Sequence, residues 1–92
     1  MDWNLVSFVT GSKLRFKLLI ELNKSKKTPS ELAHAAKTPM SHISSTLRDL
    51  EKRKLVICLT PERRKNKFYS ITNLGKDVLE FISKEIDRKP TF

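Results

Sequence analysis

Two threonine-proline pairs, Thr28-Pro29 and Thr38-Pro39, stand close together in the middle of this 92-residue chain. Threonine suits the position before a helix, and proline suits the first helical position because its missing N–H would have no partner there. Each pair therefore predicts a helix start, and Glu31 completes a capping box at the first. Since almost no chain separates the first helix from the second pair, the two helices must cross at a steep angle.

Residues 28–54 are therefore expected to form a helix-turn-helix, and the second helix has two contrasting faces. At about 100° per residue, Met40, Ile43, Leu47 and Leu50 gather on one side and predict a narrow contact with the core. Short hydroxyl side chains are mediocre helix formers because they compete for backbone hydrogen bonds. Their number on the other side indicates contacts outside the helix. That side carries Ser41, Ser45, Arg48 and Lys52, with His42 and Asp49 beside them.

The sequence around the helix-turn-helix predicts the remaining elements. Two runs rich in β-branched and aromatic residues favour strands, and the turn between them holds Pro61 and Asn66. The strands are expected to form a hairpin over residues 55–71 with basic residues at its tip. The other expected elements are helices over 2–10 and 13–23, the latter capped by Ser12, strands over 55–59 and 67–71, and a C-terminal helix over 72–87 capped by Thr72. The predicted class is α+β, mostly helical.

A chain of this length has room for one core, so residues 1–92 are expected to form a single domain that would gain from dimerisation. The C-terminal helix carries two apolar lines, one with Leu74, Val78 and Phe81. We expect one line to contact the domain and the other a second copy. A single broad stripe with partly exposed residues is the alternative. The expected dimer contacts are Trp3, Val6, Leu79, Ile82 and Ile86.

The charge balance favours a polyanionic partner. Nineteen Lys and Arg residues against ten Asp and Glu residues give a net charge of +9. A merely soluble basic surface is the alternative, and the placement of the charges decides between the two. The one cysteine, Cys58, offers neither a metal motif nor an internal disulfide. We expect its thiol to be half-buried as a small hydrophobe, with a cross-chain disulfide as the alternative.

The apolar runs are too short to span a bilayer. The first residues, MDWNLVSFV, lack a basic segment and a cleavage site, so we expect no signal peptide and a cytoplasmic location. An enzyme is not expected, because the chain has two glycines in all and no phosphate-cradling glycine loop. No cofactor or metal is expected either.

The order of these elements resembles the winged-helix DNA-binding regulators, with the ArsR/MarR-like group of archaea and bacteria as the nearest set. The resemblance covers most of residues 12–82, through SKLRFKLLIEL, TPSELAHAAKTPMSHISSTLRDLEKRKLV and YSITNLGKDVL. This chain has Lys37 and Lys54 where the family usually has glycine, a change that a left-handed turn tolerates at modest cost. The paired cysteines of metal-sensing members are missing, so metal or arsenic sensing is not implied. Ligand-sensing MarR proteins are longer, so no small-molecule effector is expected.

The resemblance implies a sequence-specific, nucleoid-associated regulator that binds double-stranded DNA as a homodimer. A winged helix that binds a protein partner and a non-specific architectural DNA binder are the alternatives. Hydroxyl and imidazole groups can donate to or accept from base edges in a major groove. The expected base contacts are Ser41, His42, Ser44 and Ser45, and the expected phosphate contacts are Thr46, Arg48, Lys52, Arg63, Arg64, Lys65 and Lys67. If about six phosphates are neutralised, log affinity should fall with log salt at a slope of about −5.

Overall fold

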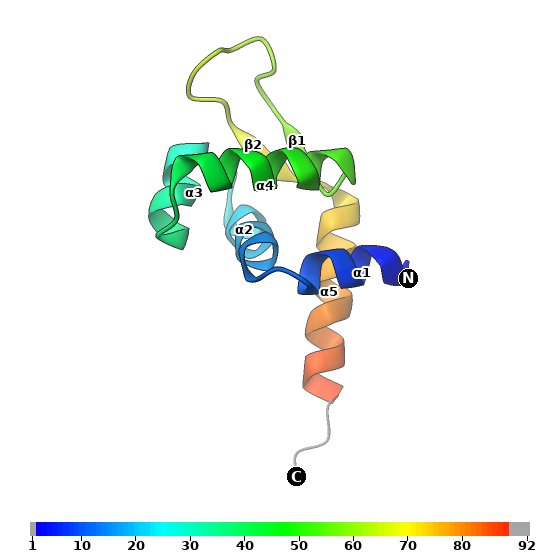
Figure 1. Cartoon of the computed structure of the whole chain (residues 1–92). Coiled ribbons are helices and arrows are strands. Elements are labelled where there is room, and N and C mark those ends of the chain that lie inside the picture. Colours follow the sequence, from blue (N-terminus) through cyan, green and yellow to red (C-terminus); the bar gives the residue numbers. More distant parts are fainter. Residues whose placement is uncertain (1, 89–92) are drawn as a thin grey trace.

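Helices dominate the computed structural model, which describes residues 2–88, with side chains as far as Lys84. One two-stranded antiparallel sheet accompanies the helices of this part of the chain (Figure 1). The order is α1 (Trp3–Thr10), α2 (Lys13–Lys24), α3 (Pro29–Ala36), α4 (Met40–Lys52), β1 (Val56–Cys58), β2 (Tyr69–Ile71) and α5 (Asn73–Arg88). The predicted α+β, mostly helical class is confirmed.

Three of the expected helix caps are present. The Ser12 hydroxyl accepts from the backbone N–H of Arg15 at 3.2 Å at the start of α2. At α3, the N–H of Glu31 donates to the Thr28 hydroxyl at 3.2 Å, and the N–H of Thr28 donates back to the Glu31 carboxylate at 2.9 Å. The Thr72 hydroxyl accepts from the N–H of Gly75 at 3.1 Å at the start of α5. These side chains satisfy N–H groups that have no partner within the helix.

The start of α4 differs from the expected threonine cap. The N-cap position is held by Pro39, and no side chain caps the helix. Thr38 instead closes the end of α3, where its hydroxyl donates to the Ala36 carbonyl at 2.9 Å and its N–H donates to the Ala33 carbonyl at 3.1 Å. Lys37, with φ of 51°, adopts the left-handed conformation that the sharp turn requires. The short connection thus uses the Thr38 hydroxyl to end one helix, and it does not serve the next.

Helix α2 occupies the centre of the molecule and contacts α1, α3, α4, β2 and α5 (Figure 1). Leu18, Leu19 and Leu22 of α2 are buried in one cluster with Ile43, Leu47 and Leu50 of α4. The inward face of α4 is therefore as expected for these three residues. Met40 was expected with them and this is wrong, because it sits in the first turn, past the edge of the core, and stays 45% exposed.

Strands β1 and β2 pair in antiparallel register, with Val56 opposite Ile71 and Cys58 opposite Tyr69. Both strands are shorter than expected, since the N–H of Phe68 already bonds the Thr60 side chain instead of the opposite backbone. On its other side Tyr69 forms a bridge with Lys27, in the connection between α2 and α3. The loop between the strands projects away from the helices (Figure 1). The base of the hairpin is thus fixed to the body, and its loop is free to contact a partner.

None of the helices within residues 2–88 has the length and apolar character needed to cross a membrane.

Candidate nucleic-acid interface

Helix α4 presents a continuous polar face to solvent. Because Ile43, Leu47 and Leu50 anchor the helix to the core, the opposite side points outward. Six of the expected contact residues are exposed there, namely Ser41, His42, Ser44, Ser45, Arg48 and Lys52. Thr46 is half-buried on the flank of the helix. The structure therefore brings the four expected base-contact residues together on one accessible surface.

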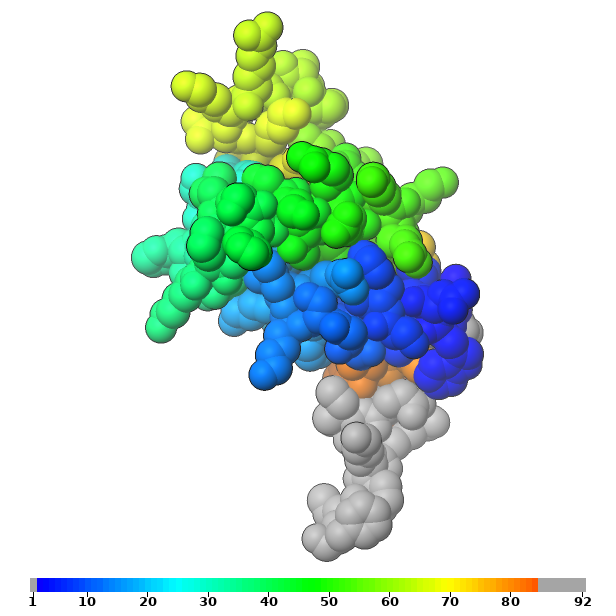
Figure 2. Space-filling view, viewed as in Figure 1, coloured from blue at the N-terminus to red at the C-terminus, as the bar shows by residue number. Residues whose placement is uncertain are grey.

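A groove of about 510 Å³ lies between α4, the start of α3 and the hairpin loop. Ser44 and Arg48 line it from α4, and Arg64, Lys65 and Lys67 line it from the loop. The loop rises beyond α4 on one side in the space-filling view (Figure 2). Arg63, the remaining expected loop residue, is also exposed. Residues far apart in the sequence thus place four cations around one concave surface.

The groove also includes residues that the sequence analysis did not single out. Glu51 of α4 and Asn66 of the loop line it, together with Tyr69, the N-cap residue Thr28 and the first two residues of α3. The capping box predicted where α3 begins, but its closeness to the hairpin follows from the Lys27–Tyr69 bridge, which has no local sequence signal. Glu51 is the acidic side chain in this lining, so the groove remains cationic.

Tyr69 forms part of the groove wall and is half-buried. Burial raises the pKa of its hydroxyl, and the neighbouring Cys58 adds to that rise. The hydroxyl therefore stays protonated at neutral pH and can act as a hydrogen-bond donor. Cys58 is free and half-buried, as expected for a thiol that packs as a small hydrophobe.

The ion pairs among the described side chains lie elsewhere in the molecule. Glu21 binds Lys17 at 3.3 Å and Lys24 at 3.1 Å, and Glu80 binds Lys84 at 3.1 Å. None of these pairs in the described part of the chain involves α4 or the hairpin loop. The cations of the groove are thus not neutralised by salt bridges there, so their charge is available to an anionic partner.

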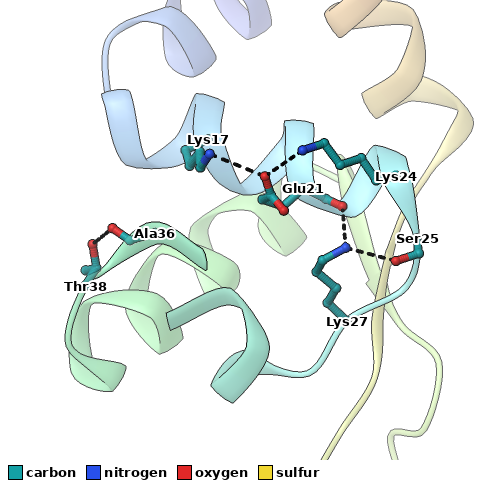
Figure 3. A network of polar contacts seen from close by, with 7 residues as sticks. All are labelled: Lys17, Glu21, Lys24, Ser25, Lys27, Ala36 and Thr38. Atoms are coloured by element: carbon teal, nitrogen blue, oxygen red, sulfur yellow. Dashed lines mark hydrogen bonds and ion pairs between the residues drawn. The ribbon is translucent and has the colours of Figure 1, made fainter. Parts of the chain in front are cut away.

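In contrast to the groove cations, the charged groups around Glu21 are paired with one another and stabilise the fold (Figure 3). It is buried, and the hydrogen bond from Lys24 holds the pKa of its carboxyl below the ordinary value of 4.5, against the opposing effect of burial. The Lys27 ammonium donates to the Glu21 carbonyl at 3.1 Å and to the Ser25 hydroxyl at 2.9 Å. These lysines fix the end of α2 and its connection to α3.

The residues expected at a dimer interface differ widely in how exposed they are in the single chain. Leu79 and Ile82 lie in the core of the single chain, where Leu79 is 9% exposed and Ile82 is 5% exposed. The expected division of α5 into a core line and a free line does not hold, because Val78 is buried beside them and the apolar stripe is broad. Val6 is half-buried. The expected contact Ile86 has a side chain outside the described residues.

Among the members of that set whose side chains are described, Trp3 is the accessible one, with 65% of its surface exposed. Its ring meets the ring of Phe81 edge to face, with 5.2 Å between centroids and 83° between planes. Helices α1 and α5 thus present an aromatic pair at the surface. The second half of α5 extends beyond α1, away from the other elements (Figure 1).

Comparison with known protein families assigns the chain to one family. The family described as the methanogenesis regulatory protein FilR1, N-terminal domain, matches residues 3–87. The chain belongs to this family. The description of this family as a regulatory protein agrees with the expected regulator. No curated protein sequence matches the chain.

Solved structures confirm the winged-helix fold of this FilR1 N-terminal domain family member. A transcriptional regulator of the MarR family from Enterococcus faecalis V583 superposes with a TM-score of 0.79 at 23% identity, over 91% of this chain and 78% of that one. The adhesin competence repressor AdcR of Streptococcus pyogenes has a TM-score of 0.71 at 16% identity, over 83% of this chain and 57% of that one. The C30AH42A mutant of Lactococcus lactis ZitR in apo form has a TM-score of 0.72 at 14% identity, over 92% of this chain and 66% of that one. The chain thus spans little more than half of AdcR.

Proposed function

We propose that this chain binds double-stranded DNA with sequence specificity and regulates transcription as a homodimer. The observation that carries the proposal is the groove in which Arg48 of α4 faces Arg64, Lys65 and Lys67 of the hairpin loop. A DNA duplex carries a negative charge about every 1.7 Å along its axis, so a cluster of cations without salt-bridge partners strongly favours binding to a duplex. The family membership of the chain supports the same partner.

The polar face of α4 has the chemistry needed to read base edges. An α-helix is about 10–12 Å across with its side chains, and the major groove of DNA is about 12 Å wide. Ser41, Ser45 and His42 lie on the exposed face and can donate to or accept from bases. Arginine and glutamine, the strongest bidentate readers, do not occur among residues 40–46. Specificity at these positions therefore rests on single or water-mediated hydrogen bonds.

The hairpin loop and the end of α4 provide the phosphate contacts in this proposal. Arg63, Arg64 and Lys65 are exposed on a loop that extends beyond α4. Phosphate contacts of this kind fix the register of a protein on DNA without reading sequence. Lys52, in the last turn of α4, is exposed on the same polar face and supports the same role.

Homodimerisation through α1 and α5 completes the proposal. Trp3 is a large aromatic side chain that is mostly exposed in the single chain. Its position beside Phe81 gives a second copy an apolar surface to bury. Two copies related by a two-fold axis would place their α4 helices about 34 Å apart, which is one turn of DNA. The expected site is therefore a pseudo-palindrome.

Selection from a random duplex pool with the purified chain tests both parts. We expect enrichment of a two-part motif with half-sites about 10 base pairs apart, and sedimentation should give twice the 10.7 kDa chain mass. Enrichment without any motif would favour a non-specific architectural binder. Failure to retain any duplex at low salt would refute DNA binding.

A protein-interaction module is the second candidate, and exposed apolar residues of the hairpin favour it. Ile57 of β1 is 50% exposed, and Leu59, just after the strand, is 47% exposed. Replacing both with serine should leave DNA binding unchanged if the chain is a DNA reader. Loss of a protein partner in that variant, with DNA binding absent from the wild type, would establish the second candidate.

A further inference from the structure

Two arginines from different elements converge on one aromatic ring at the α1–α2 junction. The Cζ atom of Arg15 lies 4.0 Å from the centroid of the Phe8 ring, and the Cζ atom of Arg53 lies 4.5 Å from it. Arg15 also donates from Nη1 to the Phe8 carbonyl at 2.8 Å. Guanidinium groups can stack on an aromatic ring and still donate N–H bonds to an anion. Both groups are thus held in place before any ligand arrives.

Arg53 lies on the side of α4 away from the hairpin. It follows Ser44 by nine residues, which is two and a half turns at about 3.6 residues per turn, and Ser44 lines the groove next to the hairpin loop. The contact with Phe8 of α1 agrees with this direction. Helix α4 lies between the hairpin on one side and α1 and α2 on the other (Figure 1).

Two lysines continue this positive side toward the other end of α4. Lys13, at the start of α2, and Lys37, in the turn before α4, are exposed and line one shallow groove of about 360 Å³. The start of α2 and the length of α4 share one face of the molecule (Figure 2). Lys17 lies nearby but is paired with Glu21. We name Lys13, Arg15, Lys37 and Arg53 the far-side strip.

The far-side strip has little negative charge against it. Within the described side chains, no ion pair includes any of its four members. Asp49, which lies one turn before Arg53 on α4, is the acidic group of that helix on the same flank, and it is half-buried. The positive charge of the far-side strip is therefore largely not offset by neighbouring acidic groups. Cations consequently lie on both sides of the polar face of α4.

We infer that the far-side strip binds phosphates of the DNA strand across the major groove from the hairpin, an inference that rests on the proposed function. A major groove is bounded by two phosphate backbones about 12 Å apart, so a helix inserted in it has one on each side. The hairpin loop contacts one backbone, and Arg53, Arg15, Lys13 and Lys37 contact the other. Phe8 acts as a positioning residue that holds both guanidinium groups toward the second backbone.

The test compares variants on the duplex that the wild type selects. We expect Arg53→Gln to weaken binding roughly five- to tenfold at 0.1 M salt, and to lower the log–log salt slope by about 0.9 for each phosphate that Arg53 neutralises, or about 1.8 for a dimer. Lys76→Gln, which removes an exposed charge from α5, is the matched control and should bind as the wild type does. Ethylation interference should place the phosphates that Arg53→Gln no longer protects on the opposite strand from those that Arg64→Gln no longer protects.

Lys37→Gly separates binding from folding. Glycine suits the φ of 51° at this position better than lysine does, so the melting temperature should stay the same or rise. DNA affinity should nevertheless fall, because the charge is gone. Wild-type affinity and slope in both Arg53→Gln and Lys37→Gly would overturn the far-side strip while leaving DNA binding intact. A wild type that binds no duplex would overturn the strip and the proposed function together.

Discussion

Arg48 of α4 and Arg64 of the hairpin loop line the same groove from two elements that are far apart in the sequence. Like charges gathered around one groove are unfavourable unless an anion lies between them. The described residues form no ion pair with either arginine. The fold therefore holds a charge arrangement that a phosphate backbone would relieve.

Replacing both Arg63 and Arg64 with alanine should weaken binding to the selected duplex by at least tenfold at 0.1 M salt. Both side chains are exposed, so the effect reflects phosphate binding and not the packing of the fold. The salt slope should fall by about 0.9 for each phosphate that the loop no longer neutralises. Fluorescence anisotropy over a range of salt concentrations measures both quantities. An unchanged slope would mean that the loop does not contact DNA.

Trp3→Ala should shift the chain toward a monomer in sedimentation, because it removes the largest exposed apolar side chain of α1. The unfolding temperature of the monomer should change little, since Trp3 is 65% exposed in the single chain. Ile57→Ala, which removes a similarly exposed apolar residue on the hairpin, is the control and should leave the mass unchanged. Identical masses for both variants and the wild type would exclude an interface at Trp3.

Thr72→Ala should lower the free energy of unfolding by about 0.5–2 kcal/mol, the usual effect of losing a helix cap. The Thr72 hydroxyl accepts from Gly75 N–H and donates to the Lys54 carbonyl at 2.7 Å, so the change also loosens α5 from the end of α4. Urea unfolding followed by circular dichroism measures the effect. Thr10→Ala, at an exposed position on α1, should stay within about 0.5 kcal/mol of the wild type.

The Glu21 carboxyl should make stability depend on pH in the acid range. Its pKa in the folded chain is lowered, so the folded state favours the charged form more than the unfolded state does. The stabilisation is present above the unfolded pKa of about 4.5 and is lost as pH falls through the lower folded value. Urea unfolding should show the Glu21→Gln variant less stable than the wild type at pH 7 and closer to it at pH 2. An equal difference at both pH values would contradict this assignment.

Local signals in the sequence account for most of the fold. The caps at Ser12, Thr28 and Thr72 depend on residues within three positions, so the sequence predicts them directly. The buried face of α4 follows from helical periodicity in the same way. The predicted Thr38 cap of α4 was wrong, because the Thr38 hydroxyl bonds to the end of α3 instead. A sequence pattern shows that a side chain can cap, but not which helix it serves.

The interface was predictable only in part. Exposure of the α4 hydroxyls and the loop cations follows from their own elements. The meeting of Tyr69 with the start of α3, and of Arg15 and Arg53 at Phe8, depends on tertiary packing between distant segments. Leu79 and Ile82 show the same limit, because the width of the core that α5 covers is set by α1 and α2. Periodicity identifies an apolar side chain without saying which surface will bury it.

Strand β2 pairs with backbone on both of its edges, because Tyr69 forms a bridge with Lys27 on one side and β1 lies on the other. Backbone hydrogen bonds between Lys27 and Tyr69 therefore join the base of the hairpin to the start of α3, whereas the loop between Leu59 and Phe68 lies outside this pairing. If the chain binds DNA as proposed, this loop would adjust to a narrower or wider duplex without changing the orientation of the helix-turn-helix. Adaptation to DNA shape would then fall to the residues of this loop, whereas the orientation of α4 is set by the fold.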